Sequence, residues 1–88
     1  MRFQYDPAKA RANVRKHGVS FADAEGVLED PLALAIEDPD APGERRYVAI
    51  GLAGSGELLV VVYVELEGEY RLISARRATR RERKAYEG

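Results

Sequence analysis

An uninterrupted apolar run in the second half of the chain limits the folds open to this sequence more than any other feature. The run, Leu58–Val64, lies within a predicted strand Leu58–Leu66 and places apolar side chains at both alternating positions. Such a strand belongs at the centre of a sheet, and the run is far too short to span a bilayer. Because the chain has only 88 residues, we expect a single domain, residues 1–88, built around this strand.

Further strands are predicted on both sides of this run, separated by short turns. Residues Arg46–Leu52 alternate in the way typical of a half-buried strand. Leu32–Glu37 precedes them as another strand, and Tyr70–Arg77 follows the central run after a tight turn. Consecutive strands joined by short turns predict an antiparallel β-meander. Phe3–Tyr5 also alternates and predicts one short N-terminal strand.

Helix signals stand before and after the predicted sheet. Asp6-Pro7 is typical of a helix start, and Gly18 is typical of a helix end. Ser20 begins a second helix that Asp30-Pro31 ends, so the two helices form a hairpin. A capping box predicts a C-terminal helix within Ala78–Gly88. The fold class is therefore α+β: a short N-terminal strand, a two-helix hairpin, an antiparallel meander and a C-terminal helix.

Charge is segregated along the chain, although the net charge is only −1. Residues 1–17 carry five Lys and Arg against one acid, residues 18–70 two against twelve, and residues 71–88 seven against two. Two basic ends around an acidic middle indicate a surface that faces a polyanion, provided that the ends meet in the fold. Two solvated helices with ordinary surface charge are the alternative. No secretion leader precedes the domain, so we expect a cytoplasmic chain without membrane contact.

Several kinds of catalytic site are excluded by residues that the chain lacks. It has no cysteine, which excludes thiolate nucleophiles and thiolate metal sites, and a single histidine excludes zinc sites built from several imidazoles. No glycine-rich loop could cradle a phosphate. Glu37, Asp38 and Asp40 could hold a divalent cation, but they lack the spacing of a calcium loop, and an exposed acidic loop is the simpler interpretation. We expect no metal site and no cofactor.

Arginine dominates the chemistry that remains. A basic cluster at the junction of the last strand and the C-terminal helix comprises Arg71, Arg76, Arg77, Arg80, Arg81, Arg83 and Lys84. Because a guanidinium group binds phosphate through two parallel hydrogen bonds, this cluster predicts a phosphate site in one pocket. A salt-bridged helix surface is the alternative. Strand alternation puts Arg76 and Arg77 on opposite sides of the sheet, with Arg71 on the same side as Arg77.

Two other side chains are candidates for proton transfer. His17 ends the first helix, where imidazole either binds the last free carbonyls or acts as a general acid or base. Tyr63 lies on the central strand, where it either packs in the core or faces a ligand, stacking on a base or donating a proton. Both interpretations stay open for both residues.

The order of these residues resembles that of the BrnT family of type II toxins. The resemblance extends over nearly the whole chain and rests on four stretches: Phe3-x-Tyr5-Asp6-Pro7-x-Lys9 with Asn13 and Lys16-His17-Gly18-Val19-Ser20-Phe21; Asp30-Pro31-Leu32-Ala33; Arg45-x-Tyr47-x-x-Ile50-Gly51; and Arg71-x-Ile73-Ser74-Ala75-Arg76-Arg77-Ala78-Thr79-x-x-Glu82-Arg83.

The resemblance implies a ribonuclease of the RelE-like group that cleaves RNA without a metal and arrests translation. It also implies a heteromeric complex with a BrnA-type antitoxin, through which alone the toxin would contact DNA. Metal-free cleavage needs an acid, a base and cations around the phosphate. The expected catalytic residues are His17, Arg76, Arg77, Tyr63 and Glu44. The expected RNA-binding residues are Arg71, Arg80, Arg81 and Lys84. A module that binds RNA, the ribosome or an antitoxin without cleavage remains the alternative.

Overall fold

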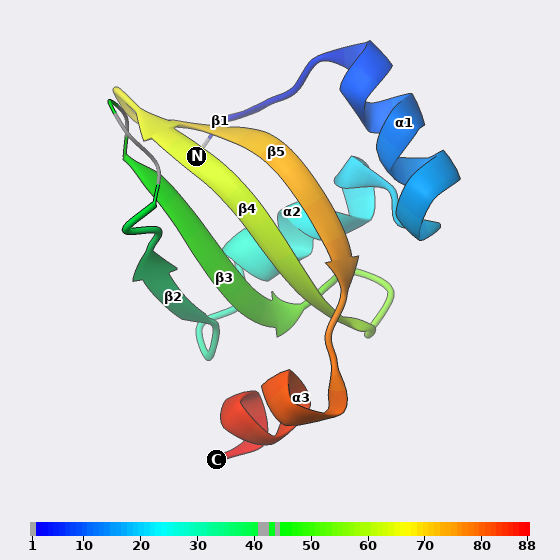
Figure 1. Cartoon of the computed structure of the whole chain (residues 1–88), viewed down its shortest axis with the longest axis vertical. Helices are drawn as coiled ribbons and strands as arrows, with labels where there is room; N and C mark the ends of the chain where they lie inside the picture. The colour runs from blue at the N-terminus through cyan, green and yellow to red at the C-terminus, as the bar shows by residue number, and fades with distance from the viewer. Residues whose placement is uncertain (1, 41–42, 44) are drawn as a thin grey trace.

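A five-stranded sheet lies at the centre of the molecule in the computed structural model, which describes residues 2–40, 43 and 45–88 (Figure 1). The elements follow along the chain as β1 (Arg2–Gln4), α1 (Pro7–His17), α2 (Phe21–Leu28), β2 (Leu34–Glu37), β3 (Arg46–Leu52), β4 (Leu58–Leu66), β5 (Glu69–Arg77) and α3 (Arg80–Glu87). The α+β fold class and the order of the elements agree with the sequence prediction.

The strands lie in the order β1-β5-β4-β3-β2, with the apolar run of β4 in the middle. Each of β2, β3 and β4 pairs antiparallel with the strand that follows it, whereas β1 pairs parallel with β5. The sheet is therefore mixed, which corrects the expectation of a purely antiparallel meander. Turn residues predict pairing only between strands that follow each other in the sequence. The strand β1 instead pairs with β5, with Arg2 beside Glu69, so no turn signal predicts this pair.

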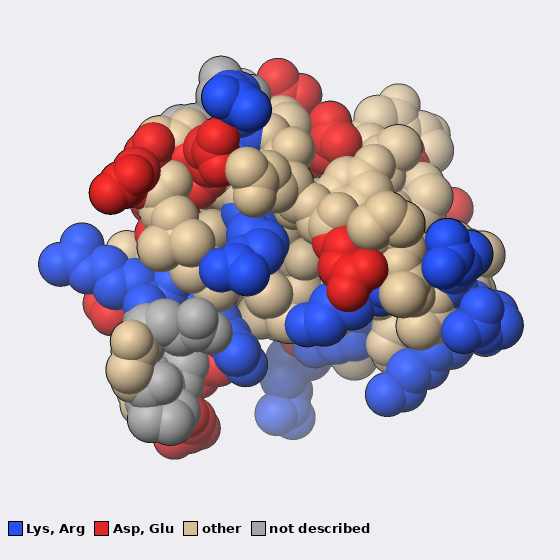
Figure 2. All heavy atoms as spheres, turned by 90° about the horizontal axis from the view of Figure 1, so that it is seen from above, with Lys and Arg blue, Asp and Glu red and all other residues tan. Residues whose placement is uncertain are grey.

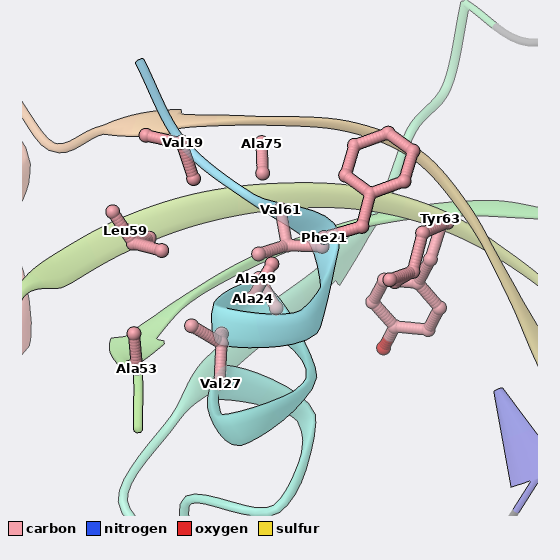
Figure 3. Close-up of a cluster of buried hydrophobic side chains, with 11 residues drawn as sticks. Val19, Phe21, Ala24, Val27, Ala49, Ala53, Leu59, Val61, Tyr63 and Ala75 are labelled. Atoms are coloured by element: carbon pink, nitrogen blue, oxygen red, sulfur yellow. The ribbon is translucent and has the colours of Figure 1, made fainter. Parts of the chain in front are cut away.

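One face of the sheet forms the hydrophobic core with the helices. Phe21 and Val27 of α2 lie against Leu59 and Val61 of β4 (Figure 3), and all four side chains are almost completely buried. Burial of a side chain of this size contributes about 1.5–3 kcal/mol. The helix α1 packs instead along β5. The core thus ties α2 to β3, β4 and β5, while α1 is tied to β5.

The opposite face of the sheet has no helix over β2 and β3, as Figure 1 shows. The side chains of Leu34, Ile36 and Leu52 on this side are 45%, 67% and 43% exposed. The helix α3 lies beyond the end of the sheet rather than across it. We call this side of the sheet the open face.

The ends of the helices form as their sequences predict. The Asp6 carboxylate accepts a hydrogen bond from the Ala8 N–H, and Gly18 ends α1 with a φ of +69°, which suits glycine. The Ser20 hydroxyl caps α2. Thr79 and Glu82 form the full capping box of α3. Among the described residues, none of the helices is long and apolar enough to cross a membrane.

Candidate functional site

The two adjacent arginines at the end of β5 point to opposite faces of the sheet, as predicted. Arg76 pairs with Val60, and its two terminal nitrogens each lie 2.8 Å from a carboxylate oxygen of Glu82 on α3. Arg77 pairs with Leu59 on the helix-covered face. Each guanidinium group already has a carboxylate partner, so the two side chains do not form a joint phosphate clamp.

Arg77 joins three parts of the fold. Its Nε donates to Glu57 at 2.8 Å, and its Nη1 donates to the backbone carbonyl of His17 at 3.0 Å. The side chain of Arg77 is still 57% exposed. Its guanidinium therefore lies at the C-terminal end of α1, next to His17, with part of its surface open to solvent.

A β-bulge corrects the expected position of Arg71. The pairing of β4 with β5 shifts between Val62 and Tyr63, so Val62 pairs with Ser74 while Tyr63 pairs with Leu72. The extra residue reverses the alternation before it, and Arg71, opposite Val64, points to the open face rather than sharing a face with Arg77. Simple counting along an ideal strand could not reveal this bulge.

The sequence-predicted basic cluster therefore does not converge in one pocket. Arg71 lines a hollow beside β1 together with Phe3, Gln4, Tyr5, Asp6 and Glu25. A separate hollow of about 300 Å³ on α3 is lined by Arg80, Arg81 and Lys84. These three cations make no ion pair with any described residue, and their common position on α3 agrees with the helical spacing.

A third hollow, between α1 and β5, contains the only histidine. It has a volume of about 200 Å³ and is lined by Lys9, Ala12, Asn13, Lys16, His17, Ile73 and Ser74. We call it the α1–β5 hollow. Two lysines, an imidazole and a hydroxyl thus surround one space. Figure 2 shows lysine and arginine side chains gathered along the side of the molecule where α1 lies.

Asn13 forms the floor of this hollow. Its side-chain nitrogen donates to the carbonyls of Val19 at 2.9 Å and Ala75 at 2.8 Å, and its oxygen accepts from the Ala75 N–H at 3.1 Å. The amide therefore hydrogen-bonds to the exposed edge of β5 as a neighbouring strand would. Because the residue is 94% buried, with 6% of its surface exposed, these hydrogen bonds fix the distance between α1 and β5.

The sequence prediction missed the part played by Lys9, Asn13, Lys16 and Ser74. The first three stand at positions i, i+4 and i+7 of one helix, which places them on one face. That spacing was the available signal. Ser74 has no comparable signal, because its place in the hollow depends on the packing of α1 along β5 in the folded chain.

Tyr63 lies in the core and away from the three hollows. Its ring stacks on Tyr47, with centroids 5.5 Å apart, and meets Tyr70 edge-on at 5.2 Å. Only 7% of the residue is exposed, and burial raises the pKa of its hydroxyl. The structure thus favours the core-packing interpretation of Tyr63. Glu44 lies outside the described residues.

Two polar contacts fix α3 to the rest of the molecule. The paired Arg76 guanidinium lowers the pKa of Glu82 to about 2. At the other end of the helix, the Tyr86 hydroxyl donates to Asp30 at 2.6 Å, and the Leu52 N–H donates to the same carboxylate oxygen at 2.8 Å. The hydrogen bond from the Leu52 N–H has the larger effect, and together with the one from Tyr86 it lowers the pKa of Asp30.

No group of three or more His, Asp or Glu side chains suited to a metal ion occurs within the part of the chain that the structure describes. Asp38 instead accepts a hydrogen bond from the Asp40 N–H at 3.0 Å, which closes a local turn.

Comparison with known proteins places this geometry in a family. A family model described as the ribonuclease toxin BrnT of type II toxin–antitoxin systems matches residues 5–82. The chain belongs to the BrnT family. A similar solved structure is the 1.1 Å crystal structure of the Brucella abortus ribonuclease toxin BrnT, with a TM-score of 0.67 and 28% sequence identity. The match covers 91% of this chain and 99% of the other. No curated protein sequence gave a match.

Membership of the BrnT family confirms the resemblance found in the sequence. It makes the chain a member of a ribonuclease toxin family of toxin–antitoxin systems and implies a protein antitoxin as partner.

Proposed function

We propose that this chain is a metal-independent endoribonuclease of the RelE-like group that cleaves RNA, arrests translation in the cytoplasm and is neutralised by a BrnA-type antitoxin. In this proposal the toxin contacts DNA only through the antitoxin. Family membership supports ribonuclease activity. The observation that carries the choice of site is the α1–β5 hollow, where His17 shares one space with Lys9 and Lys16.

His17 is the proposed general base or acid. In metal-free cleavage the 2′-oxygen loses its proton, bonds to phosphorus and expels the 5′-oxygen, which takes up a proton as the P–O bond breaks. Imidazole suits either proton transfer because it is the side chain whose charge changes near neutral pH. The candidates for the second proton transfer are Tyr63 and Glu44.

Cations must stabilise the additional negative charge on the phosphate in the transition state. Lys9 and Lys16 line the same hollow as His17, and the partly exposed Arg77 lies beside it. We assign the phosphate contact to these three residues. Arg76 is held by Glu82 in a two-bond pair, so we propose that it positions α3. Tyr63 and Glu44 remain weaker candidates for proton transfer.

The cations outside the hollow suit the RNA chain on either side of the cut. Arg80, Arg81 and Lys84 lie together on α3, and Arg71 lies near β1. Contacts of this kind bind phosphates without reading sequence and make the affinity depend steeply on salt.

Cleavage of a labelled single-stranded RNA by the purified full-length chain in excess EDTA tests this function. We expect cleavage to continue at an unchanged rate. Binding without cleavage in EDTA that is restored by Mg²⁺ would reject metal independence, whereas binding without cleavage under all conditions would favour a non-catalytic RNA-binding module.

A further inference from the structure

The register of the sheet gives the composition of the open face row by row. Directly paired residues on antiparallel strands point to the same face. One row across the sheet consists of Leu34, Ile50, Val60 and Arg76. The next row consists of Ile36, Val48, Val62 and Ser74. Both rows are aliphatic from β2 to β4 and become polar only on β5.

These aliphatic side chains are most exposed near β2. Ile36 is 67% exposed, Leu34 is 45% exposed, and Leu52 beside them is 43% exposed. We define the apolar patch as Leu34, Ile36, Val48, Ile50, Leu52 and Val62. A contiguous apolar patch on a sheet face that lacks a covering layer is typical of a binding surface.

Positive charge borders the apolar patch on two sides. The row next to the one that begins at Ile36 contains Arg71, opposite Val64. The helix α3 lies beyond the end of β3 (Figure 1), and the Tyr86–Asp30 hydrogen bond fixes it there. The cations of that helix, Arg80, Arg81 and Lys84, have no ion-pair partner among the residues that the structure describes. A partner that covers the patch would therefore gain from acidic residues at its edges.

The side chains of the patch suit a protein better than RNA. Unpaired RNA bases are bound by stacking on aromatic rings or guanidinium planes. The patch contains only Leu, Ile and Val, which pack well against the apolar side of an amphipathic helix.

The patch is also continuous with the α1–β5 hollow. Ser74 ends the row that begins at Ile36, and the same residue lines the hollow that contains His17. A segment lying along this row would reach the edge of the hollow that contains His17. Three strand spacings separate β2 from β5, a distance of roughly 14 Å, which a helix of about ten residues spans.

We propose that the apolar patch receives an amphipathic helix of the protein antitoxin, whose aliphatic side covers the two rows and whose acidic residues meet the bordering cations. This inference rests on the proposed toxin–antitoxin function. Beyond that function, it identifies the toxin surface that the antitoxin covers and the chemistry of the antitoxin segment. It also explains how that segment covers the hollow at Ser74.

The test measures binding between the purified full-length toxin and the antitoxin encoded by the neighbouring reading frame. Ile36→Lys and Leu34→Lys place a charge in the patch, and we expect each to weaken the affinity by at least about tenfold. Ile36→Ala, which tests the same contact at a strongly exposed position, should weaken it several-fold. Leu66→Lys is the matched control, because Leu66 is also 46% exposed but pairs with Glu69 at the far end of β4.

Each variant is also tested for thermal unfolding and for RNA cleavage without antitoxin. Unchanged cleavage with weakened inhibition by the antitoxin supports the proposal. Equal affinity of the wild type, Ile36→Ala and Ile36→Lys would overturn it while leaving the ribonuclease proposal intact. Failure of the wild type to bind the antitoxin would instead reject the partner assigned under the proposed function.

Sedimentation and RNA kinetics of the same variants distinguish two other candidate occupants of the patch, a second copy of this chain and RNA. If the free wild type sediments as a dimer and Ile36→Lys as a monomer, the patch joins two copies of this chain and the proposal is wrong. If Ile36→Lys raises the KM for RNA without changing antitoxin affinity, the patch binds RNA and the proposal is equally wrong.

Discussion

The side chain of Asn13 pairs with the backbone of Ala75 in both directions, donating to its carbonyl and accepting from its N–H. Asn13→Leu would leave both backbone groups, and the carbonyl of Val19, without a partner inside the protein. Each buried group left unpaired costs about 1–3 kcal/mol. We expect a loss of at least about 2 kcal/mol in the free energy of unfolding, measured in urea. The exposed Arg11→Ala on the same helix should change it by less than about 0.5 kcal/mol, and equal stabilities of the two variants would contradict this assignment.

His17→Ala should reduce RNA cleavage by about a hundredfold or more, because the reaction loses its proposed general acid or base. The fold should persist, since Arg77 contacts the backbone carbonyl of His17, which the substitution keeps. Single-turnover cleavage of a labelled RNA in EDTA gives the rate. Arg15→Ala, which removes a cation of α1 that does not line the hollow, should lower the rate only a few-fold. If His17→Ala kept full activity, proton transfer would have to be assigned to another residue.

Arg77→Ala should reduce cleavage far more than Arg76→Ala. We expect a loss of about a hundredfold in kcat for Arg77→Ala, because it removes a cation beside the reacting phosphate. Arg76→Ala removes a partner of Glu82 instead and should lower kcat less than about tenfold. Circular dichroism and unfolding curves check the folding of both variants. A folded double variant with wild-type kcat would exclude both arginines from the phosphate site.

The Glu82 carboxylate should stabilise the fold at neutral pH and lose this effect in strong acid. Its pKa is about 2 in the folded protein against 4.5 for an ordinary glutamate, so its contribution is complete above about pH 4.5 and disappears as the pH falls towards 2. Glu82→Gln should cost about 1 kcal/mol at pH 7, a modest value because Arg76 is 42% exposed and solvent screens the pair. Unfolding free energies at pH 7 and pH 2.5 test this, with Glu87→Gln as control. A difference from the wild type that stays constant between these pH values would contradict it.

Gly26→Ala should destabilise the protein although alanine favours helices. A Cβ atom at this position would lie 2.5 Å from the backbone nitrogen of Gly54. The gain in helix propensity is about 1 kcal/mol, whereas overpacking against rigid backbone costs about 1–3 kcal/mol. We expect a net loss in thermal unfolding experiments. Ala22→Gly, at an exposed position of α2, should also lower the free energy of unfolding by about 1 kcal/mol. A Gly26→Ala variant more stable than the wild type would show that the backbone at Gly54 moves to make room for the Cβ atom.

Local signals predicted the secondary structure well. The strand Arg46–Leu52, the apolar run of β4 and the capping box at Thr79 lie where the sequence places them. These features depend on residues close together in the chain. By contrast, the parallel pairing of β1 with β5 joins residues that no local pattern connects.

The candidate site was predicted only in part, for a physical reason. The sequence identifies His17 and the arginines as reactive groups, but it cannot tell which carboxylates bind Arg76 and Arg77. Those partners, Glu82 and Glu57, come together only in the folded chain. The bulge at Tyr63 likewise moved Arg71 to the other face of the sheet.

The contacts of the N-terminal segment with β5 also decide when the α1–β5 hollow can form during synthesis. Arg2 lies beside Glu69, and Asn13 is bound to Ala75. The first helix therefore finds its docking place only after the ribosome has released the last strand. A nascent chain that stops at β4 lacks one wall of the hollow around His17, so this hollow takes shape only once β5 has emerged from the ribosome.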